Sequence, residues 1–286
     1  MIVPATRLYS LAYSQYALGH FNVAHLEQVL GVFHGAREAR APFILAFTPA
    51  ARRYATPRLL EGLVTAARDE FPEAVFAVHL DHGDEAGCYD AIESGVYSSV
   101  MIDGSSRPFE DNIALTRRVA DRAHERGLSV EAELGVVGGK EDHLDIDQKM
   151  ALLTDPDQAA EFVARSGCDS LAVAVGTSHG AYKFAGEEGL RLDRLGEIQR
   201  RLPDRFPLVL HGASSVNIDE VRRINAAGGR LNPQAKGVAE SELPDAIRLG
   251  VCKVNMATDA RLLWTRVHRE FFRDYPEGFD PAAPGR

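Results

Sequence analysis

Three histidines of this chain, His82, His179 and His211, stand at or just beyond the ends of apolar runs, and each is followed by a glycine. The runs are continuous rather than alternating, as in parallel strands that are buried on both faces. A catalytic zinc site takes three protein ligands, often imidazoles, and keeps one position open. A single histidine at a strand end is more often a hydrogen-bonded structural group than a ligand. Three in equivalent positions favour a metal site. The other histidines, His20 among them, look like surface or helix residues, except His79, which could be a core group.

Carboxylates stand near the same run ends. Asp81 directly precedes His82, so in an extended chain the two side chains point in different directions, one toward a metal and the other toward a substrate. An alternative role for Asp81 is to orient the histidine. Glu131 and Glu133 share one strand face. Because a buried carboxylate needs a partner, the alternative for this pair is a structural ion pair with a lysine or arginine.

A further carboxylate, Glu141, lies in the connection 136–154, shortly after Gly138 and Gly139. Loops longer than a compact domain needs are often functional. An acid in such a loop would approach a substrate when the loop closes. The alternative is an ordinary solvated charge.

Small residues and hydroxyls stand at the ends of the later runs, at Gly180, 212-GAS-214 and 255-NMATD-259. Backbone N–H groups at such strand-to-helix turns bind phosphate without net positive charge. Helix capping explains the same residues equally well, since Ser, Asn and Asp are good caps.

Apolar runs that alternate with helical segments predict an α/β fold, a single (β/α)8 TIM barrel over residues 1–286. A short N-terminal helix is expected at 5–16, and long loops are expected after strands 5 and 7. The expected strands are 17–23, 43–48, 75–80, 99–103, 128–134 and runs that start near residues 170, 207 and 251. The carboxyl ends of such strands gather at one mouth, which would bring the histidines and carboxylates together.

Composition limits the partners of the chain. A net charge of -9 and a pI near 5.6 argue against nucleic acid. No apolar run is long enough to span a bilayer, and the first residues lack the basic start and apolar core of a signal peptide. The three cysteines show no CxxC spacing, which is typical of reduced thiols. We therefore expect a cytoplasmic protein without nucleic-acid or membrane partners.

Taken in order, these motifs resemble the class II, metal-dependent ketose-bisphosphate aldolases of the fructose- and tagatose-1,6-bisphosphate type. The resemblance covers almost the whole chain. The matching segments are GHFNV (19–23), LDHG (80–83), MIDGS (101–105), VEAELGVVGGKED (130–142), AVGTSHGAYKF (174–184), LHGASSV (210–216) and KVNMATDAR (253–261).

The resemblance implies zinc-dependent, reversible aldol cleavage of a ketose 1,6-bisphosphate, with fructose 1,6-bisphosphate favoured, to dihydroxyacetone phosphate and glyceraldehyde 3-phosphate. It makes His82, His179 and His211 the ligands of Zn²⁺. It also implies a monovalent cation (Na⁺ or K⁺) near the phosphate, and a homodimer or homotetramer.

Further roles follow from the same resemblance. Asp81 would be the acid/base for the aldehyde oxygen, and Glu141 would handle the C3 proton of dihydroxyacetone phosphate. Asp103 and Glu133 would hold the zinc in an alternative, buried state. The implied substrate-binding residues are Asn22, Thr48, Gly180, Lys183, Gly212, Ser214, Asn255, Thr258 and Asp259.

Some residues depart from the family pattern. Ala46, Thr48 and Ala50 stand where a glutamine, a serine and a glycine are common, so the usual serine contact would fall to Thr48. His20 replaces a small residue, and Ala257 replaces the aspartate of many fructose-type members. Tagatose- and sedoheptulose-bisphosphate therefore stay open as substrates. Two competing hypotheses are a metal-dependent barrel hydrolase and a non-catalytic partner subunit.

Overall fold

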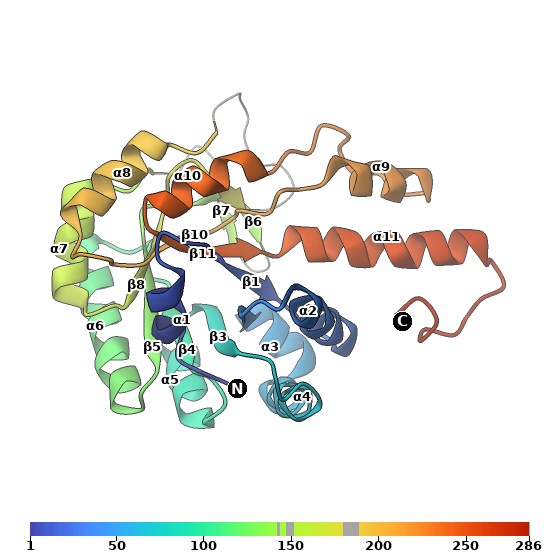
Figure 1. Ribbon diagram of the computed structural model, residues 1–286, viewed down its shortest axis with the longest axis horizontal. Coiled ribbons are helices and arrows are strands. Elements are labelled where there is room, and N and C mark those ends of the chain that lie inside the picture. The colour runs from blue at the N-terminus through green and yellow to red at the C-terminus, as the bar shows by residue number, and fades with distance from the viewer. Residues whose placement is uncertain (142–143, 147–151, 180–188, 286) are drawn as a thin grey trace.

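The protein, seen in a computed structural model, is described at residues 1–141, 144–146, 152–179 and 189–285, with the backbone alone at 139–141, 144–146 and 179. The described strands include a closed parallel barrel in the order β1-β11-β10-β8-β5-β4-β3-β2 (Figure 1). The expected (β/α)8 barrel is confirmed. Its strands are β1 (Leu18–Asn22), β2 (Phe43–Phe47), β3 (Phe76–Gly83), β4 (Ser99–Ile102), β5 (Ser129–Leu134), β8 (Ser170–Val173), β10 (Leu208–Leu210) and β11 (Val251–Met256).

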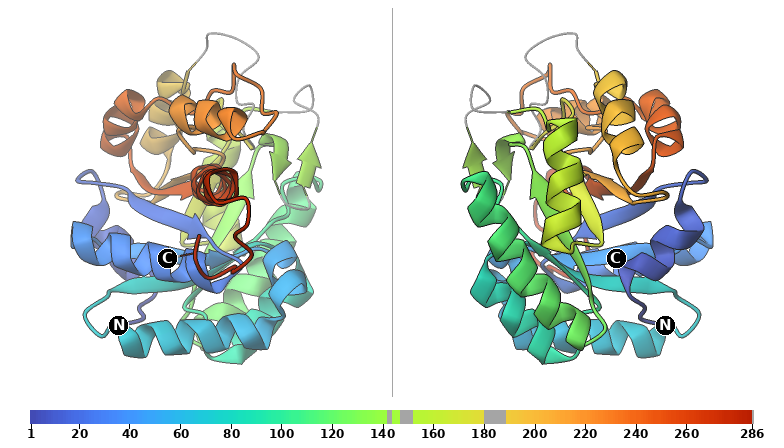
Figure 2. Two further views of the ribbon diagram at one scale, coloured as in Figure 1. Left: turned by 90° about the vertical axis from the view of Figure 1, so that its right-hand side faces the viewer. Right: turned by 90° about the vertical axis from the view of Figure 1, so that its left-hand side faces the viewer.

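Helices surround the strands, as Figure 2 shows from two opposite sides. They are α2 (Leu26–Ala39), α4 (Pro57–Glu70), α5 (Glu85–Ser94), α6 (Phe109–Glu125), α7 (Pro156–Ser166), α8 (Leu192–Arg201), α9 (Ile218–Ala226), α10 (Leu243–Arg248), which follows the 3₁₀ turn η2 (Glu240–Glu242), and α11 (Thr258–Asp274). Local signals start several of them. Asp84 and Asp155, for example, cap α5 and α7 by accepting hydrogen bonds from backbone N–H groups. No helix in the described ranges is long and apolar enough to cross a membrane.

One helix, α3 (Pro49–Ala55), was not expected from the sequence. It starts directly after β2, where Thr48 accepts a hydrogen bond from the backbone N–H of Ala51 at 3.2 Å. A proline at the first helical position adds a second start signal. Thr48 is therefore a helix cap at the barrel mouth, and its contact with substrate remains a prediction.

The long connection after β5 contains strands. β6 (Gly138–Glu141) pairs antiparallel with β7 (Leu144–Ile146) and parallel with β9 (Ser178–His179). The expected sixth strand thus ends at Val173, and His179 lies on a separate small sheet rather than at the end of a barrel strand. In that sheet Gly139 stands opposite His179, so the strand that carries Glu141 runs beside the predicted metal ligand.

The N-terminal helix α1 (Ala5–Ala12) is shorter than expected and closes the amino-terminal end of the barrel. Its Leu8 and Tyr9 pack in a buried cluster with Leu18, Ile44 and Ala77, which lie near the starts of their strands. Helix α1 therefore lies at the end of the barrel opposite the predicted site. It forms the floor of the barrel interior.

Truncating a buried side chain of α1 should destabilise the fold. Leu8 is 3% exposed and Leu11, on the same helix, is 66% exposed. We expect Leu8→Ala to lower the free energy of unfolding by about 2–5 kcal/mol, because it leaves a cavity. The matched Leu11→Ala change should cost less than about 0.5 kcal/mol. Urea denaturation followed by circular dichroism measures both, and equal effects would show that α1 does not close the barrel.

Candidate active site

The carboxyl ends of β3, β4, β5 and β10 bring several predicted site residues together. Candidate ligand atoms of Asp81, His82 and His211 lie within 4.8 Å of one another, as do those of His82, Asp103 and Glu133. The rings of His82 and His211 are 4.6 Å apart, centroid to centroid. Except for Asp103, which is half-buried, all of these residues are buried. The expected meeting of strand ends at one mouth is confirmed for this set.

The end of β3 is irregular, and this shapes the cluster. His82 has a φ of 48°, in the left-handed region that non-glycine residues seldom adopt. The pairing of β3 with β4 shifts between Leu80 and Gly83. Irregularities of this kind re-aim side chains near active sites. As a result candidate ligand atoms of Asp81 and His82 lie in one cluster, although Asp81 bonds to Asn22 and Asn255 and His82 bonds to Asp103.

Carboxylates orient both histidines. Nδ1 of His82 lies 2.8 Å from Oδ2 of Asp103, and Nε2 of His211 lies 3.0 Å from Oε1 of Glu131. Burial by itself would lower the pKa of His82, but Asp81 and the hydrogen bond with Asp103 raise that pKa to about 10. The two glutamates likewise outweigh burial and raise the pKa of His211 to about 9. The cluster is therefore an environment that favours positive charge.

The chemistry of these donors suits a divalent metal ion. Oε2 of Glu133 is buried and makes no hydrogen bond within the described residues, yet it lies 3.2 Å from Nδ1 of His211. A protonated His211 pairs with the Glu133 carboxylate across this distance. A metal ion between the two would take the place of that proton and would be bound by both groups. Imidazole nitrogens and carboxylate oxygens are ligands that Zn²⁺ accepts. The residues present therefore fit the implied metal.

Asp81 is held by two amides. Asn22 donates from Nδ2 to Oδ2 of Asp81 at 2.8 Å, and Asn255 donates from Nδ2 to Oδ1 at 3.4 Å. Burial by itself would raise the pKa of Asp81, but the positive charge of the nearby His82 and His211 holds it well below its ordinary value. The carboxylate is therefore ionised and fixed in direction, which suits a group that takes a proton from a hydroxyl.

From the sequence, His20 is expected on the surface or in a helix, and the structure corrects this. His20 is fully buried on β1 and meets His79 edge-on, with ring centroids 5.4 Å apart. Burial and Lys253 hold the pKa of His20 well below its ordinary value, so its ring is neutral. The sequence held one indication of this burial. His20 is two residues before Asn22, so the two side chains lie on the same face of the strand. His79, expected as a core group, is buried as expected.

The loop after β10 is braced by the start of α11. The carboxylate of Asp259 accepts hydrogen bonds from the backbone N–H groups of Ser215 at 2.9 Å and Val216 at 2.7 Å. The N–H of Thr258 donates to Oγ of Ser214 at 3.2 Å. Val216 has a φ of 52°, which is strained for a β-branched residue. Asp259 thus holds the loop in shape, and its direct contact with substrate remains a prediction, as do those of Gly212 and Ser214.

Four predicted site positions fall partly or wholly outside the described residues. Gly180 and Lys183 are outside, and the side chains of Glu141 and His179 are outside although their backbones lie in β6 and β9.

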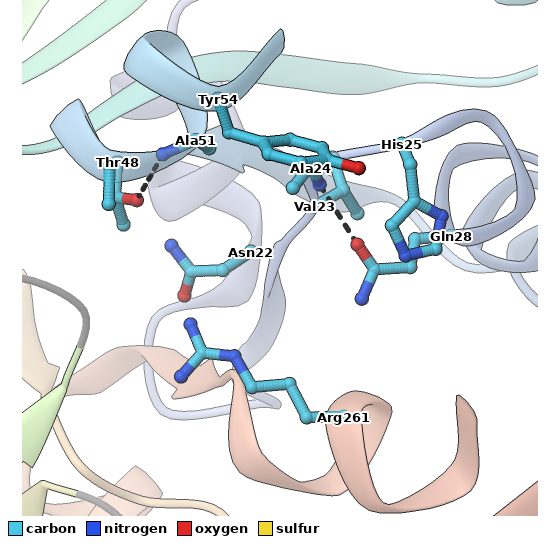
Figure 3. A pocket seen from close by; sticks show the side chains of 10 residues that line it. Asn22, Val23, Ala24, His25, Gln28, Thr48, Ala51, Tyr54 and Arg261 are labelled. Carbon is cyan, nitrogen blue, oxygen red and sulfur yellow. Dashed lines mark hydrogen bonds between the residues drawn. The ribbon is translucent and has the colours of Figure 1, made fainter. Parts of the chain in front are cut away.

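A cavity of about 240 Å³ adjoins the cluster on the side of Asn22. Its lining includes Asn22, Thr48, Tyr54 and Arg261, and Figure 3 shows the guanidinium of Arg261 turned toward Asn22. Arg261 ends the KVNMATDAR motif, but the sequence alone assigns it no role. Its spacing could have indicated a role, because Arg261 lies three residues after Thr258, one helical turn along α11 and on the same helix face.

The fold and the cluster define a class, a (β/α)8 barrel with candidate metal ligands at the carboxyl ends of its strands. The family model "Fructose-bisphosphate aldolase class-II" matches residues 5–284. The chain is 42% identical over 278 residues to a fructose-bisphosphate aldolase of Giardia intestinalis, covering 95% of this chain and 84% of that protein. It is 43% identical over 267 residues to one from Thermus caldophilus, covering 93% and 86%.

A solved structure is similar throughout. The YdjI aldolase from Escherichia coli K12 matches with a TM-score of 0.74 and 29% identity, covering 100% of this chain and 91% of that one. The chain belongs to the class II fructose-bisphosphate aldolase family.

The loop after β10 leads to a prediction about its support. The backbone N–H of Val238 donates to the carbonyl oxygen of Ser214 at 3.1 Å, and a Cβ added at Gly237 would lie 2.2 Å from that oxygen. We expect Gly237→Ala to destabilise the protein by about 1–3 kcal/mol through overpacking, and to weaken binding of dihydroxyacetone phosphate. In Gly62→Ala, where nothing lies within 4 Å, stability should rise by about 0.5–1 kcal/mol. Thermal unfolding and calorimetric titration measure both effects, and unchanged binding in Gly237→Ala would separate this loop from the substrate.

Proposed function

We propose that the chain catalyses reversible aldol cleavage of a ketose 1,6-bisphosphate, with fructose 1,6-bisphosphate as the favoured substrate. The products are dihydroxyacetone phosphate and glyceraldehyde 3-phosphate. The observation that carries the proposal is the buried cluster of His82, His211 and Glu133 beside the fixed carboxylate of Asp81. Membership of the family supports the same reaction.

The metal ion of this proposal is Zn²⁺, held by His82, His211 and His179, with Asp103 and Glu133 as ligands of a second, buried position. When bound, the zinc supplies a Lewis acid that stabilises negative charge on the ketose oxygens. The chain itself provides the remaining functions. Asp103 and Glu131 keep His82 and His211 oriented, and both histidines are buried.

Asp81 takes the proton of the C4 hydroxyl during cleavage and returns it to the aldehyde oxygen during condensation. Its charge state suits this role, because neighbouring groups keep it ionised. The amides of Asn22 and Asn255 fix its two oxygens, which leaves its remaining lone pairs for the substrate. Glu141, carried on β6, exchanges the C3 proton of dihydroxyacetone phosphate.

The two phosphates bind on different sides of the cluster in this proposal. Gly180, Lys183, Gly212, Ser214, Thr258 and Asp259 bind or support the first phosphate, with a monovalent cation beside it. Arg261, Asn22 and Thr48 line the adjoining cavity, where a cationic side chain suits the second phosphate. We further propose that residues 1–286 form a single domain. The enzyme would act in the cytoplasm as a homodimer or homotetramer.

A coupled cleavage assay tests the proposed reaction. Fructose-, tagatose- and sedoheptulose-bisphosphate are supplied separately, and triose phosphate formation is followed with and without a chelator. We expect turnover with the fructose substrate, about one zinc per chain in the active protein, and loss of turnover on chelation. Activity that survives full demetallation would contradict the mechanism. Release of inorganic phosphate would favour a hydrolase, and no turnover on any substrate would favour a non-catalytic subunit.

The role of Asp81 is tested separately. We expect Asp81→Ala to reduce turnover by roughly 10²-fold or more, which is the usual scale for loss of a general acid–base. Bound zinc should stay near the wild-type level. Asp84→Ala is a matched control, since Asp84 is exposed and only caps α5. Metal analysis and steady-state kinetics give both values. If metal is lost in parallel with turnover, Asp81 is a ligand or orients one.

A further inference from the structure

We propose that Lys253 is a positioning residue of the metal site, acting through Glu131 to fix which ring nitrogen of His211 faces the metal. This inference rests on the proposed metal site and deepens it. Nζ of Lys253 lies 2.7 Å from both carboxylate oxygens of Glu131, and Oε1 of Glu131 lies 3.0 Å from Nε2 of His211. The three side chains come from β11, β5 and β10 and meet inside the barrel.

Stability alone is a weak reason for such a pair. The side chains of Lys253 and Glu131 are 0% and 1% exposed. Two charges taken out of water lose hydration that their attraction only partly restores, so apolar residues of the same volume are often equally good or better. The barrel floor already consists of such residues, among them Leu18 and Ile44. A buried ammonium beside a buried carboxylate therefore indicates a role other than holding the fold.

That role follows from what each atom can donate. A carboxylate only accepts hydrogen bonds, so the nitrogen of His211 that contacts Glu131 carries the hydrogen. Lys253 donates to both oxygens of Glu131, which prevents the carboxylate from rotating. With Nε2–H held by Glu131, Nδ1 points to the opposite side, toward Oε2 of Glu133 at 3.2 Å, and it is the nitrogen left to face a metal ion there. A partner on one ring nitrogen thus selects the other as the ligand.

His82, the other predicted zinc ligand whose side chain is described, is held through the opposite ring nitrogen. His82 contacts Asp103 through Nδ1, so it presents Nε2 to the cluster. Asp103 is itself held by the hydroxyl of Ser105 at 2.7 Å and by the backbone N–H of the same residue at 3.1 Å. Donors from the loop can hold the Asp103 carboxylate because Asp103 is close to the surface. Glu131 lies deep in the barrel, where no such loop donor among the described residues reaches it, and the ammonium of Lys253 holds its carboxylate instead.

The experiment measures metal binding and ring tautomer rather than cleavage. Demetallated wild type, Lys253→Met and Glu131→Gln are titrated with Zn²⁺ against a competing chelator. We expect the two variants to bind zinc about 10–100-fold more weakly than wild type, the usual effect of losing a group that orients a ligand. Cys252→Ala is the matched control, since Cys252 is the neighbouring buried residue on β11 and packs under α1. Its zinc affinity should be unchanged at a comparable loss of stability.

Nitrogen-15 NMR of histidine-labelled, zinc-loaded wild type gives a second measurement that needs no variant. We expect His211 to carry its hydrogen on Nε2 and to bind zinc through Nδ1. A hydrogen on Nδ1, or equal zinc affinity in wild type and Lys253→Met, would overturn the inference while leaving the proposed reaction intact. Absence of zinc binding by wild type would overturn both. If Lys253→Met does not fold, the zinc titration is carried out on Lys253→Gln, which keeps a donor of similar length but can hold only one oxygen of Glu131 firmly, and a zinc affinity equal to that of wild type would overturn the inference.

Discussion

The site depends on how buried carboxylates are balanced by nitrogen groups inside the barrel. Asp81, Glu131 and Glu133 lie where water cannot solvate them, and each faces an amide, an imidazole or an ammonium. An uncompensated charge in such a place would be strongly destabilising. The same contacts that keep these charges tolerable also fix the directions of His82 and His211. One set of contacts therefore both balances the buried charges and orients the predicted metal ligands.

Backbone geometry at the mouth serves that arrangement. The left-handed conformation of His82 and the register shift beside it allow two consecutive residues to enter one cluster. On the other side, Asp259 braces the strained Val216 in the loop after β10. The first lies in the last residues of β3, and the second lies in the loop after β10. Barrels carry their chemistry at this end, since the strands below remain free to pack.

The small sheet of β6, β7 and β9 adds a connection that a bare barrel lacks. It joins the segment after β5 to the segment after β8 through the pairing of Gly139 with His179. A predicted metal ligand and the strand carrying a predicted acid therefore lie side by side in the backbone. The departures from the family pattern have different environments. Thr48 caps α3 at the cavity, whereas His20 lies deep beside His79.

The sequence by itself determined the strand and helix alternation, the closed barrel and the family, because continuous apolar runs and ordered motifs are local properties of the chain. It also placed His82 and His211 at strand ends, and it raised an ion pair for Glu131 as an alternative. Tertiary structure alone decided that the partner is Lys253, 122 positions away. It also decided that Asp81 joins His82 in one cluster, that His179 leaves the barrel strand for β9, and that Asp259 holds a loop. These outcomes depend on which strands face each other across the interior and on single backbone angles. Neither can be derived from the spacing of residues or from composition.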